Sequence, residues 1–600
     1  MTENETAAEQ RARMQLPGSA FAELAHGNGS PAVVRTLWDG QWNRRLVMLL
    51  AFRRAVTQDP GLFGPLPPVD TAWHALEDAQ VSAPAEVAAL IMHPQVGNWL
   101  AYALRRQLGG AASPAPLHTD FGQFNTLALA AAAAARQPFT TVVPLRDGRV
   151  MVPRLGMAHF SRGTGYDVAE AGTAGGRIWF SHGDQRIDVP DDGGEADGWW
   201  PLPQVSVGTG PELIVWLDRL DPMRDLADPV DPAPLSPAEL GRWTELLDDA
   251  WTILTRDHAE LAASLAAGVT SLVPLPVGDG WDTRSASTGE AFGAVMCSPP
   301  PDAETLAVSL VHEFMHIKLG GLMHLVPLTT PAGNPSLYAP WRDDPRPPGG
   351  LLQGVYAFLG ITAFWRERKR SGRRLHHFEY AYARMQTTEA LATARQAGGL
   401  TDQGVRFIDG LLEELASWQH DEVDGEAAAL ARLVADGHRA GWRIRHCRPE
   451  AEDIEALARL WSDGAPAAIV RPSTVLPDPE MRYWSAGRLG LARRRLIAPD
   501  HFHDVRAEDW AAGLTDADLA LFLGERDTAA KGFADRLIDD PEDVDAWTGL
   551  GLALKPGRAA RALHERPEIV LAVHRRLLAG PGENPAPREL AEWVGRALPD

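Results

Sequence analysis

The chain has 600 residues, 45% of them hydrophobic and 23% charged, which is the composition of an ordinary globular protein and more chain than one core usually organises. Its net charge of −22 argues against a nucleic acid or an anionic membrane surface as the main partner, because both would repel it. Only two cysteines occur, Cys297 and Cys447, which excludes a disulfide framework and a cysteine-rich metal site. The first residues lack the apolar core of a signal peptide, and no run of about 20 apolar residues follows. We therefore expect a cytoplasmic protein of two or three domains.

The first part of the chain is predicted to be helical and then to change to β-structure. Residues 1–16 are polar and expected to be disordered. Residues 17–138 repeat apolar side chains at three- and four-residue spacing, which predicts the helical N-terminal part of a catalytic region, with the alanine-rich stretch from Leu127 to Ala135 as a buried helix. Residues 139–220 alternate short β-branched and aromatic runs with Asp-Gly and Gly-Gly turns, which predicts an antiparallel β region.

Prolines interrupt the chain in residues 221–237, which we expect to form an extended connector. Residues 238–400 are predicted to be a helical metal-binding catalytic core, and residues 401–600 a C-terminal helical domain. The stretch DPEDVDAWTGLGLAL, residues 540–554, is similar to half of a tetratricopeptide unit, which gives this domain a repeat-like character. The expected fold class is α+β and mainly helical: a helical metal-binding core with an inserted antiparallel β region and a C-terminal all-helical region.

One motif carries the functional prediction, VSLVHEFMHIKLG at residues 308–320. On an α-helix His312 and His316 lie one above the other on one face, so that both imidazoles can bind one ion at about 2 Å. Glu313 projects to the edge of that face, where it can reach a metal-bound water or a substrate. The flanking residues are apolar, and burying these three groups without partners would be costly. The motif therefore predicts a metal site rather than a chance arrangement in a core helix.

Two histidines need a third ligand, and we favour Asp344. It lies in the loop YAPWRDDPRP, residues 338–347, which aromatic residues and prolines make rigid. Arg342 and Arg346 stand beside it and can hold an anion.

The other candidates are His324, which could return to the metal if the helix broke at Gly320-Gly321, and three residues of the next helical stretch, Gln353, Tyr356 and Glu367. Two histidines with a carboxylate leave a face open for a bidentate cosubstrate on Fe(II). Three ligands with one open water position suit zinc hydrolysis equally well. Spacing does not choose between them.

Six segments in the same order carry a family resemblance: IMHPQVGNWL (91–100), FGQFNTLALAAAAAARQPFTTVVPLRDGRVMVPRLG (121–156), WLDRLDPMRD (216–225), SASTGEAFGAV (285–295), LVHEFMHIKLGGLMHLVPL (310–328) and LYAPWRDDPRPPGGLLQGVYAFLGITAFWR (337–366). In these segments the chain resembles the HExxH-type peptide-modification family, whose members are α-ketoglutarate-dependent peptide β-hydroxylases of ribosomally synthesised peptide pathways. The resemblance covers roughly residues 17–370 and leaves the C-terminal part unmatched.

The resemblance implies an Fe(II) enzyme that uses α-ketoglutarate (2-oxoglutarate) and O2 to hydroxylate the β-carbon of a residue in a precursor peptide. His312 and His316 would bind iron, and Arg346, or else Arg342, would pair with the distal carboxylate of 2-oxoglutarate. The family usually has an aspartate where this chain has His324, which leaves the ligand set open. The expected partners are the precursor peptide and other peptide-modifying enzymes, with no nucleic acid and no membrane.

Two other functions fit the motif. In a zinc metallopeptidase, Glu313 would act as general base and deprotonate a zinc-bound water. In a non-catalytic peptide-binding scaffold, the metal would be structural, and Glu313→Gln would leave function intact. Metal loading coupled to succinate formation distinguishes the hydroxylase from the peptidase.

Overall fold

The computed structural model describes residues 16–161, 163–226, 228–276, 284–331, 336–476, 487–580 and 585–598. The expectation of disorder for residues 1–16 falls outside these ranges, apart from Leu16. Helices make up 59% of the chain and strands 12%, which confirms the mainly helical α+β class. Among the described helices, none combines the length and the apolarity needed to cross a membrane.

The chain divides into two compact units, residues 1–24 with 28–326, and residues 25–27 with 327–600. The division falls inside the segment 238–400, which we expected to form one core. The expected boundary at residue 400 separates α13 (Arg374–Gln396) from α14 (Asp402–Ser417), yet these two helices pack against each other. Composition changes at residue 400, but it does not show which helices share a core.

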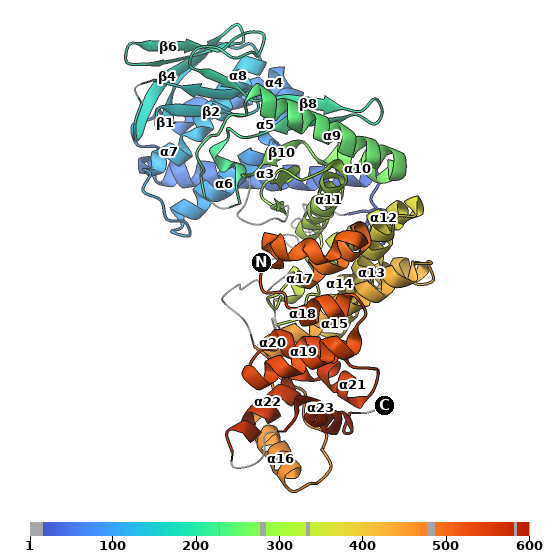
Figure 1. Ribbon diagram of the computed structural model, residues 1–600. Helices are drawn as coiled ribbons and strands as arrows, with labels where there is room; N and C mark the ends of the chain where they lie inside the picture. Colours follow the sequence, from blue (N-terminus) through green and yellow to red (C-terminus); the bar gives the residue numbers. More distant parts are fainter. Residues whose placement is uncertain are drawn as a thin grey trace. The chain divides into compact units, whose positions relative to one another are not determined.

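The N-terminal helices of the first unit surround an aromatic core. The ring of Phe52 lies 5.4 Å from that of Trp99 and 5.1 Å from that of Phe121. The alanine-rich helix is buried as predicted and packs on strands of the larger sheet (Figure 1). The helices of this unit are α2 (Gly18–Ala25), α3 (Pro31–Gln58), η1 (Pro60–Phe63), α4 (Val69–Ser82), α5 (Pro84–Ile91), α6 (Pro94–Gln107), α7 (Leu117–Phe121), α8 (Gln123–Ala134), η2 (Pro222–Arg224), α9 (Pro237–Asp257), α10 (Ala259–Gly268) and α11 (Ala303–Leu325).

Seven antiparallel strands form the larger sheet, in the order β6-β5-β4-β1-β2-β3-β7. Two-residue turns join β1 to β2 at Asp147-Gly148 and β4 to β5 at Gly175-Gly176, and all four residues have positive φ, as such hairpin turns require. The predicted turns are therefore present. The strands are β1 (Phe139–Arg146), β2 (Arg149–Val152), β3 (Gly156–His159), β4 (Tyr166–Ala174), β5 (Arg177–His182), β6 (Gln185–Asp188) and β7 (Trp199–Pro201).

A second sheet of five strands has the order β11-β12-β10-β9-β8, and its strands β9, β10 and β12 run parallel. We expected residues 204–217 to belong to one antiparallel region and residues 271–297 to be helical, and the structure differs in both. Strands β10 and β12 are buried on both faces, and a short, continuous apolar run does not reveal its period. The strands are β8 (Gln204–Val207), β9 (Leu213–Leu217), β10 (Ser271–Pro274), β11 (Ser285–Ala286) and β12 (Ala294–Cys297).

The register of this sheet places Ser271 and Ser285 on opposite faces. Ser285 of β11 and Pro274 of β10 both pair with Cys297 of β12, the strand between them, and Pro274 follows Ser271 by three residues. Because side chains alternate along a strand, Ser271 and Ser285 point to opposite faces. Ser271 contacts Gln95 of α6, and Ser285 contacts Glu313 of α11. The two helices therefore approach the sheet from opposite sides.

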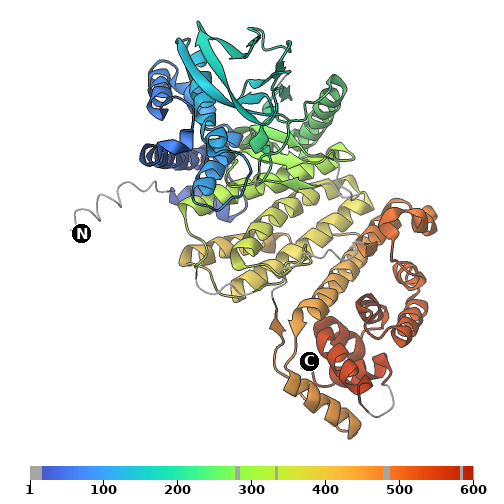
Figure 2. The ribbon, with the colours of Figure 1, turned by 90° about the vertical axis from the view of Figure 1, so that its left-hand side faces the viewer.

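In its described residues the second unit is helical, with one short pair of strands, β13 and β14. Consecutive helices from α18 to α21 pack against each other, in the orange to red part of the chain (Figure 2). Its elements are α12 (Pro348–Arg368), η3 (Lys369–Ser371), α13, α14, α15 (Gly425–His446), β13 (Cys447–Arg448), α16 (Ala451–Ser462), β14 (Thr474–Val475), α17 (Gly487–Ile497), η4 (Pro499–Ala507), η5 (Asp509–Ala511), α18 (Asp516–Phe522), α19 (Arg526–Asp539), α20 (Val544–Ala553), α21 (Arg558–Glu565), α22 (Pro567–Leu578) and α23 (Pro587–Gly595).

Candidate metal centre

The motif lies on α11, a continuous helix from Ala303 to Leu325. Asp302 begins this helix, because its side chain accepts a hydrogen bond of 2.8 Å from the backbone N–H of Thr305. Most of the apolar residues around the motif are buried, as the sequence predicts. The histidines and the glutamate are therefore presented by a rigid element of the core.

The imidazoles of His312 and His316 converge. Their Nε2 atoms lie 3.1 Å apart, with the ring planes at 70° to each other. Two nitrogens bound to one ion at about 2.1 Å lie about 3.0 to 3.4 Å apart when the angle between the bonds is about 90 to 109°. The observed separation fits this range. The same distance suits a hydrogen bond between the rings, so the metal content of the protein distinguishes the two.

The carboxylate of Glu313 completes the group. Its Oε1 lies 3.7 Å from Nε2 of His312, and one ligand atom from each of the three residues lies within 4.8 Å of the others. Ser285 donates a hydrogen bond of 2.7 Å to Oε1, and Ser287 donates one of 2.6 Å to Oε2. The side chain is only 2% exposed, whereas that of His312 is 27% exposed. The two serines thus hold the buried carboxylate of Glu313 in place, whereas the imidazole of His312 is partly exposed.

The sequence prediction missed the two serines that contact Glu313. The segment 285–295 contributes to the family resemblance, but nothing there assigns a role to its hydroxyl groups. The available signal was the spacing, because Ser285 and Ser287 are two residues apart and therefore face the same side of an extended segment.

The electrostatics of the centre favour neutral imidazole over imidazolium. Burial, opposed by the charge of Glu313 and reinforced by that of His316, lowers the pKa of His312 to about 4. At neutral pH the ring is therefore uncharged and has a nitrogen lone pair that can bind a metal. Burial raises the pKa of the Cys297 thiol to about 12, and the charge of Glu313 adds to the effect. Cys297 thus stays a thiol, and the centre offers nitrogen and oxygen ligands.

His324 is placed away from this group. The expectation that the helix breaks at Gly320-Gly321 is wrong, because α11 continues through both glycines. A Cβ on Gly321 would lie 3.0 Å from Phe292, so this glycine allows close packing and does not end the helix. His324 follows His316 by eight residues, about 12 Å along the helix axis. It cannot turn back to the same ion.

Asp344 lies between the two arginines of its loop, in the second unit. Nε of Arg342 donates to Oδ1 at 2.7 Å, and Nη1 of Arg346 donates to Oδ2 at 3.3 Å. Burial alone would raise the pKa of Asp344, but the two guanidinium groups outweigh it and hold this pKa below its usual value. The structure thus brings these three side chains of the loop together, with the aspartate itself as the anion that both arginines bind. Asp344 as third metal ligand stays a prediction, since the histidines belong to the first unit.

The remaining candidates lie on α12, also in the second unit. Tyr356 is fully buried against Phe407, with ring centroids 5.4 Å apart, and burial raises the pKa of its phenol. Glu367 forms an ion pair with Arg370 one turn further along the chain. Gln353 is partly buried on the same helix. Tyr356 and Glu367 therefore already have structural roles.

Comparison of the chain with protein-family models and with curated proteins found no match. The functional proposal therefore depends on the geometry of this centre and on the motifs described above.

Proposed function

We propose that this protein is an Fe(II)- and 2-oxoglutarate-dependent enzyme of the cytoplasm that hydroxylates the β-carbon of a residue in a ribosomally made precursor peptide. The observation that carries the proposal is the convergence of His312, His316 and Glu313 on one point beside a partly exposed imidazole. Two histidines and a carboxylate are the ligand set of mononuclear iron oxygenases, which keep one face of the ion open. The family resemblance supplies the substrate class.

Different residues of the centre would bind the metal ion and orient the carboxylate beside it. His312 and His316 would hold the ion through Nε2, and Ser285 and Ser287 would fix Glu313 beside it. When bound, iron with 2-oxoglutarate and O2 supplies the chemistry that inserts one oxygen atom into a C–H bond, with succinate and CO2 as the other products. Asp344 stays our predicted third ligand from the second unit, whereas Glu313 is the carboxylate that the first unit itself supplies.

Arg342 and Arg346 are the proposed site for the distal carboxylate of 2-oxoglutarate. The two guanidinium groups share one carboxylate, that of Asp344, so the cluster keeps one net positive charge. Nε of Arg346 is buried and has no hydrogen-bond partner in the part of the chain that the structure describes, which leaves a donor for a further anion. A second carboxylate would neutralise the remaining positive charge of the cluster and accept a hydrogen bond from Nε of Arg346.

The role of Glu313 separates this proposal from a zinc metallopeptidase. A general base must take a proton from a metal-bound water and carry it away. Each oxygen of Glu313 already accepts a hydrogen bond from a serine, and the side chain is almost fully buried. These contacts favour a positioning role. The free, buried cysteines agree with a reducing compartment.

The test is anaerobic reconstitution of the full chain with Fe(II) or Zn(II), followed by exposure to O2 and 2-oxoglutarate. Succinate formation with iron and none with zinc is the expected result. Co-expression with a precursor peptide encoded nearby, followed by mass measurement, is expected to show the gain of one oxygen atom.

Cleavage of the peptide with the zinc-loaded protein would establish the peptidase instead. Binding of the peptide without change in mass, and with no succinate formed, would establish the scaffold. His324→Ala is the matched control, because it removes an imidazole from the same helix outside the group.

A further inference from the structure

A second group of potential metal ligands lies in the first unit, on the side of the five-stranded sheet that faces α6. His93 immediately precedes α6, Asp218 directly follows β9, and Asp221 precedes the short helix η2. One ligand atom from each lies within 4.8 Å of the other two. The three residues are 3%, 0% and 6% exposed, so all are more than nine-tenths buried.

Two polar atoms of this group, Nε2 of His93 and Oδ2 of Asp218, are buried without a hydrogen-bond partner among the described residues. The other oxygen of Asp218 is well satisfied, since the backbone N–H groups of Leu220 and Asp221 donate to Oδ1 at 3.0 and 2.9 Å. The local turn therefore orients the carboxylate through Oδ1 and leaves Oδ2 without a partner among the described residues. Buried polar atoms in folded proteins rarely lack a partner, and a bound ion would satisfy both of these atoms at once.

The charge of the group points to a cation. In the described part of the chain neither Asp218 nor Asp221 forms an ion pair. The guanidinium of Arg224 acts on both carboxyl groups by its charge, but it donates to backbone carbonyl oxygens, among them that of Asp221. Arg45 likewise donates to the backbone carbonyl oxygen of His93. The two buried carboxylates therefore lack a direct cationic partner among the described residues, and a bound cation would supply one.

We propose that His93, Asp218 and Asp221 bind a divalent first-row transition metal ion, separate from any ion held by His312 and His316. Ligand atoms around one ion at about 2.1 Å lie at most about 4.2 Å apart, so side-chain movements of a few tenths of an ångström close the site. One imidazole and two carboxylates suit zinc, manganese or iron.

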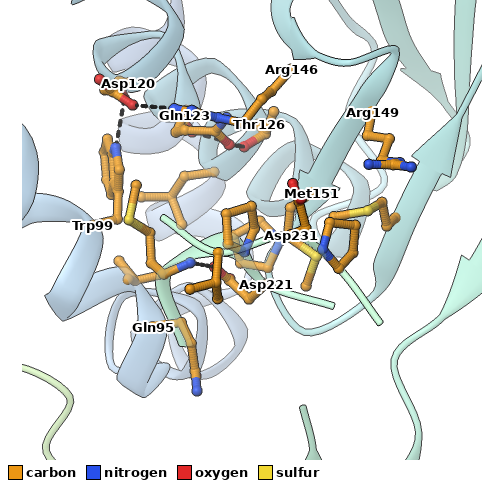
Figure 3. Close-up of a pocket in the computed structure, with 18 of the residues that line it drawn as sticks. Gln95, Trp99, Asp120, Gln123, Thr126, Arg146, Arg149, Met151, Asp221 and Asp231 are labelled. Carbon is orange, nitrogen blue, oxygen red and sulfur yellow. Dashed lines mark hydrogen bonds and ion pairs between the residues drawn. The ribbon is translucent and has the colours of Figure 1, made fainter. Parts of the chain in front are cut away.

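A small pocket adjoins this site and is lined by Asp221 and Gln95 (Figure 3). Its volume is about 50 Å³, which holds a few water molecules but no peptide. Oε1 of Gln95 is a further buried acceptor that none of the described residues contacts by a hydrogen bond. Water from the pocket can therefore complete the coordination of the ion.

The site joins two segments that are distant in the sequence: the start of α6, and the turn that connects the end of β9 to η2. Its ligands are buried and its pocket is small, so the ion has a structural role and holds this edge of the sheet together.

The test uses the full-length His312→Ala/His316→Ala variant, stripped with a chelator, titrated with Zn²⁺ and desalted before metal analysis. We expect one bound equivalent of zinc. Adding Asp218→Asn and Asp221→Asn is expected to abolish it, while the matched control Asp231→Asn, which changes a pocket residue outside the group, retains it.

No bound zinc in the folded double-alanine variant would overturn the proposal, and so would zinc that the two asparagine substitutions leave in place. If the asparagine variants do not fold, His93→Gln replaces them and should weaken zinc binding by at least about tenfold. The readout is metal content, so it stands apart from the proposed hydroxylation: the second ion can be present in a protein that forms no succinate.

Discussion

The two ligand groups of the first unit occupy opposite faces of one sheet and differ in how they are built. His312, Glu313 and His316 come from one helix within five residues, and part of the group is exposed. His93 lies 125 residues before Asp218 along the chain, Asp221 follows Asp218 by three residues, and all three are buried.

The comparison separates two ways of making a site. A helix brings ligands together by its period. Such a group can lie near the surface, and it can gain or lose its ion without a change of the fold. A sheet edge places ligands by topology, so the group becomes part of the core and its ion part of the stability. We therefore expect the first group to control turnover and the second to control unfolding.

The largest expected effect is on turnover. His312→Ala/His316→Ala should lower succinate formation at least about 1000-fold, because the loss of the ion removes several kcal/mol of transition-state stabilisation. The measurement is succinate release with iron in excess. His324→Ala should retain wild-type rates; equal losses in both variants would show that the helix, and not the ligand group, was damaged.

The next effect concerns the buried carboxylate. Glu313→Gln keeps the shape but presents an amide N–H₂ to one of the two serines, so we expect turnover to fall about 10- to 100-fold. Iron content and rate should be measured together. Unchanged turnover would show that Glu313 has no role in the proposed reaction.

The third effect distinguishes the two groups by stability. A ligand present at about 100 times its Kd stabilises the folded state by about 2.7 kcal/mol, which is about 5 °C in Tm for a unit of this size. Chelation should therefore lower the Tm of the wild-type protein and of the double-alanine variant alike. The Tm of the Asp218→Asn/Asp221→Asn variant should not respond to chelation. A full response in this variant would show that the two groups do not differ in their effect on stability.

The smallest effect is expected from the serines. Ser285→Ala or Ser287→Ala removes one hydrogen bond to a buried carboxylate, worth about 1 to 3 kcal/mol, part of which relaxation recovers. Turnover should fall a few-fold in each single variant, and the double variant should approach Glu313→Gln. Steady-state kinetics at saturating 2-oxoglutarate checks this order.

The sequence predicted what depends on local spacing. The helix of residues 308–320, the hairpins with Asp147-Gly148 and Gly175-Gly176, and the buried alanine-rich helix are all present. In each case the signal lies within a few residues. The convergence of the two motif histidines follows from the same helical period.

Pairings between distant segments were not predictable in this way. Strands β10 and β12 are four-residue apolar runs whose partners lie elsewhere in the chain. His93 lies close to Asp218 only because the carboxyl end of the parallel strand β9 lies beside the start of α6. No spacing of residues in the sequence indicates this contact. The hydroxyl contacts of Ser285 depend on the same topology.

The path of the chain between the units has a practical consequence for dissecting the protein. Residues 25–27 belong to the second unit although residues on both sides belong to the first, and His26 lies 3.5 Å from Glu413 of α14. A protein truncated after Val326 would contain residues 25–27 but lack the second-unit residues with which they belong. Because the chain passes from the first unit to the second and back at these residues, the units should first be expressed as co-expressed fragments rather than by truncation at one position.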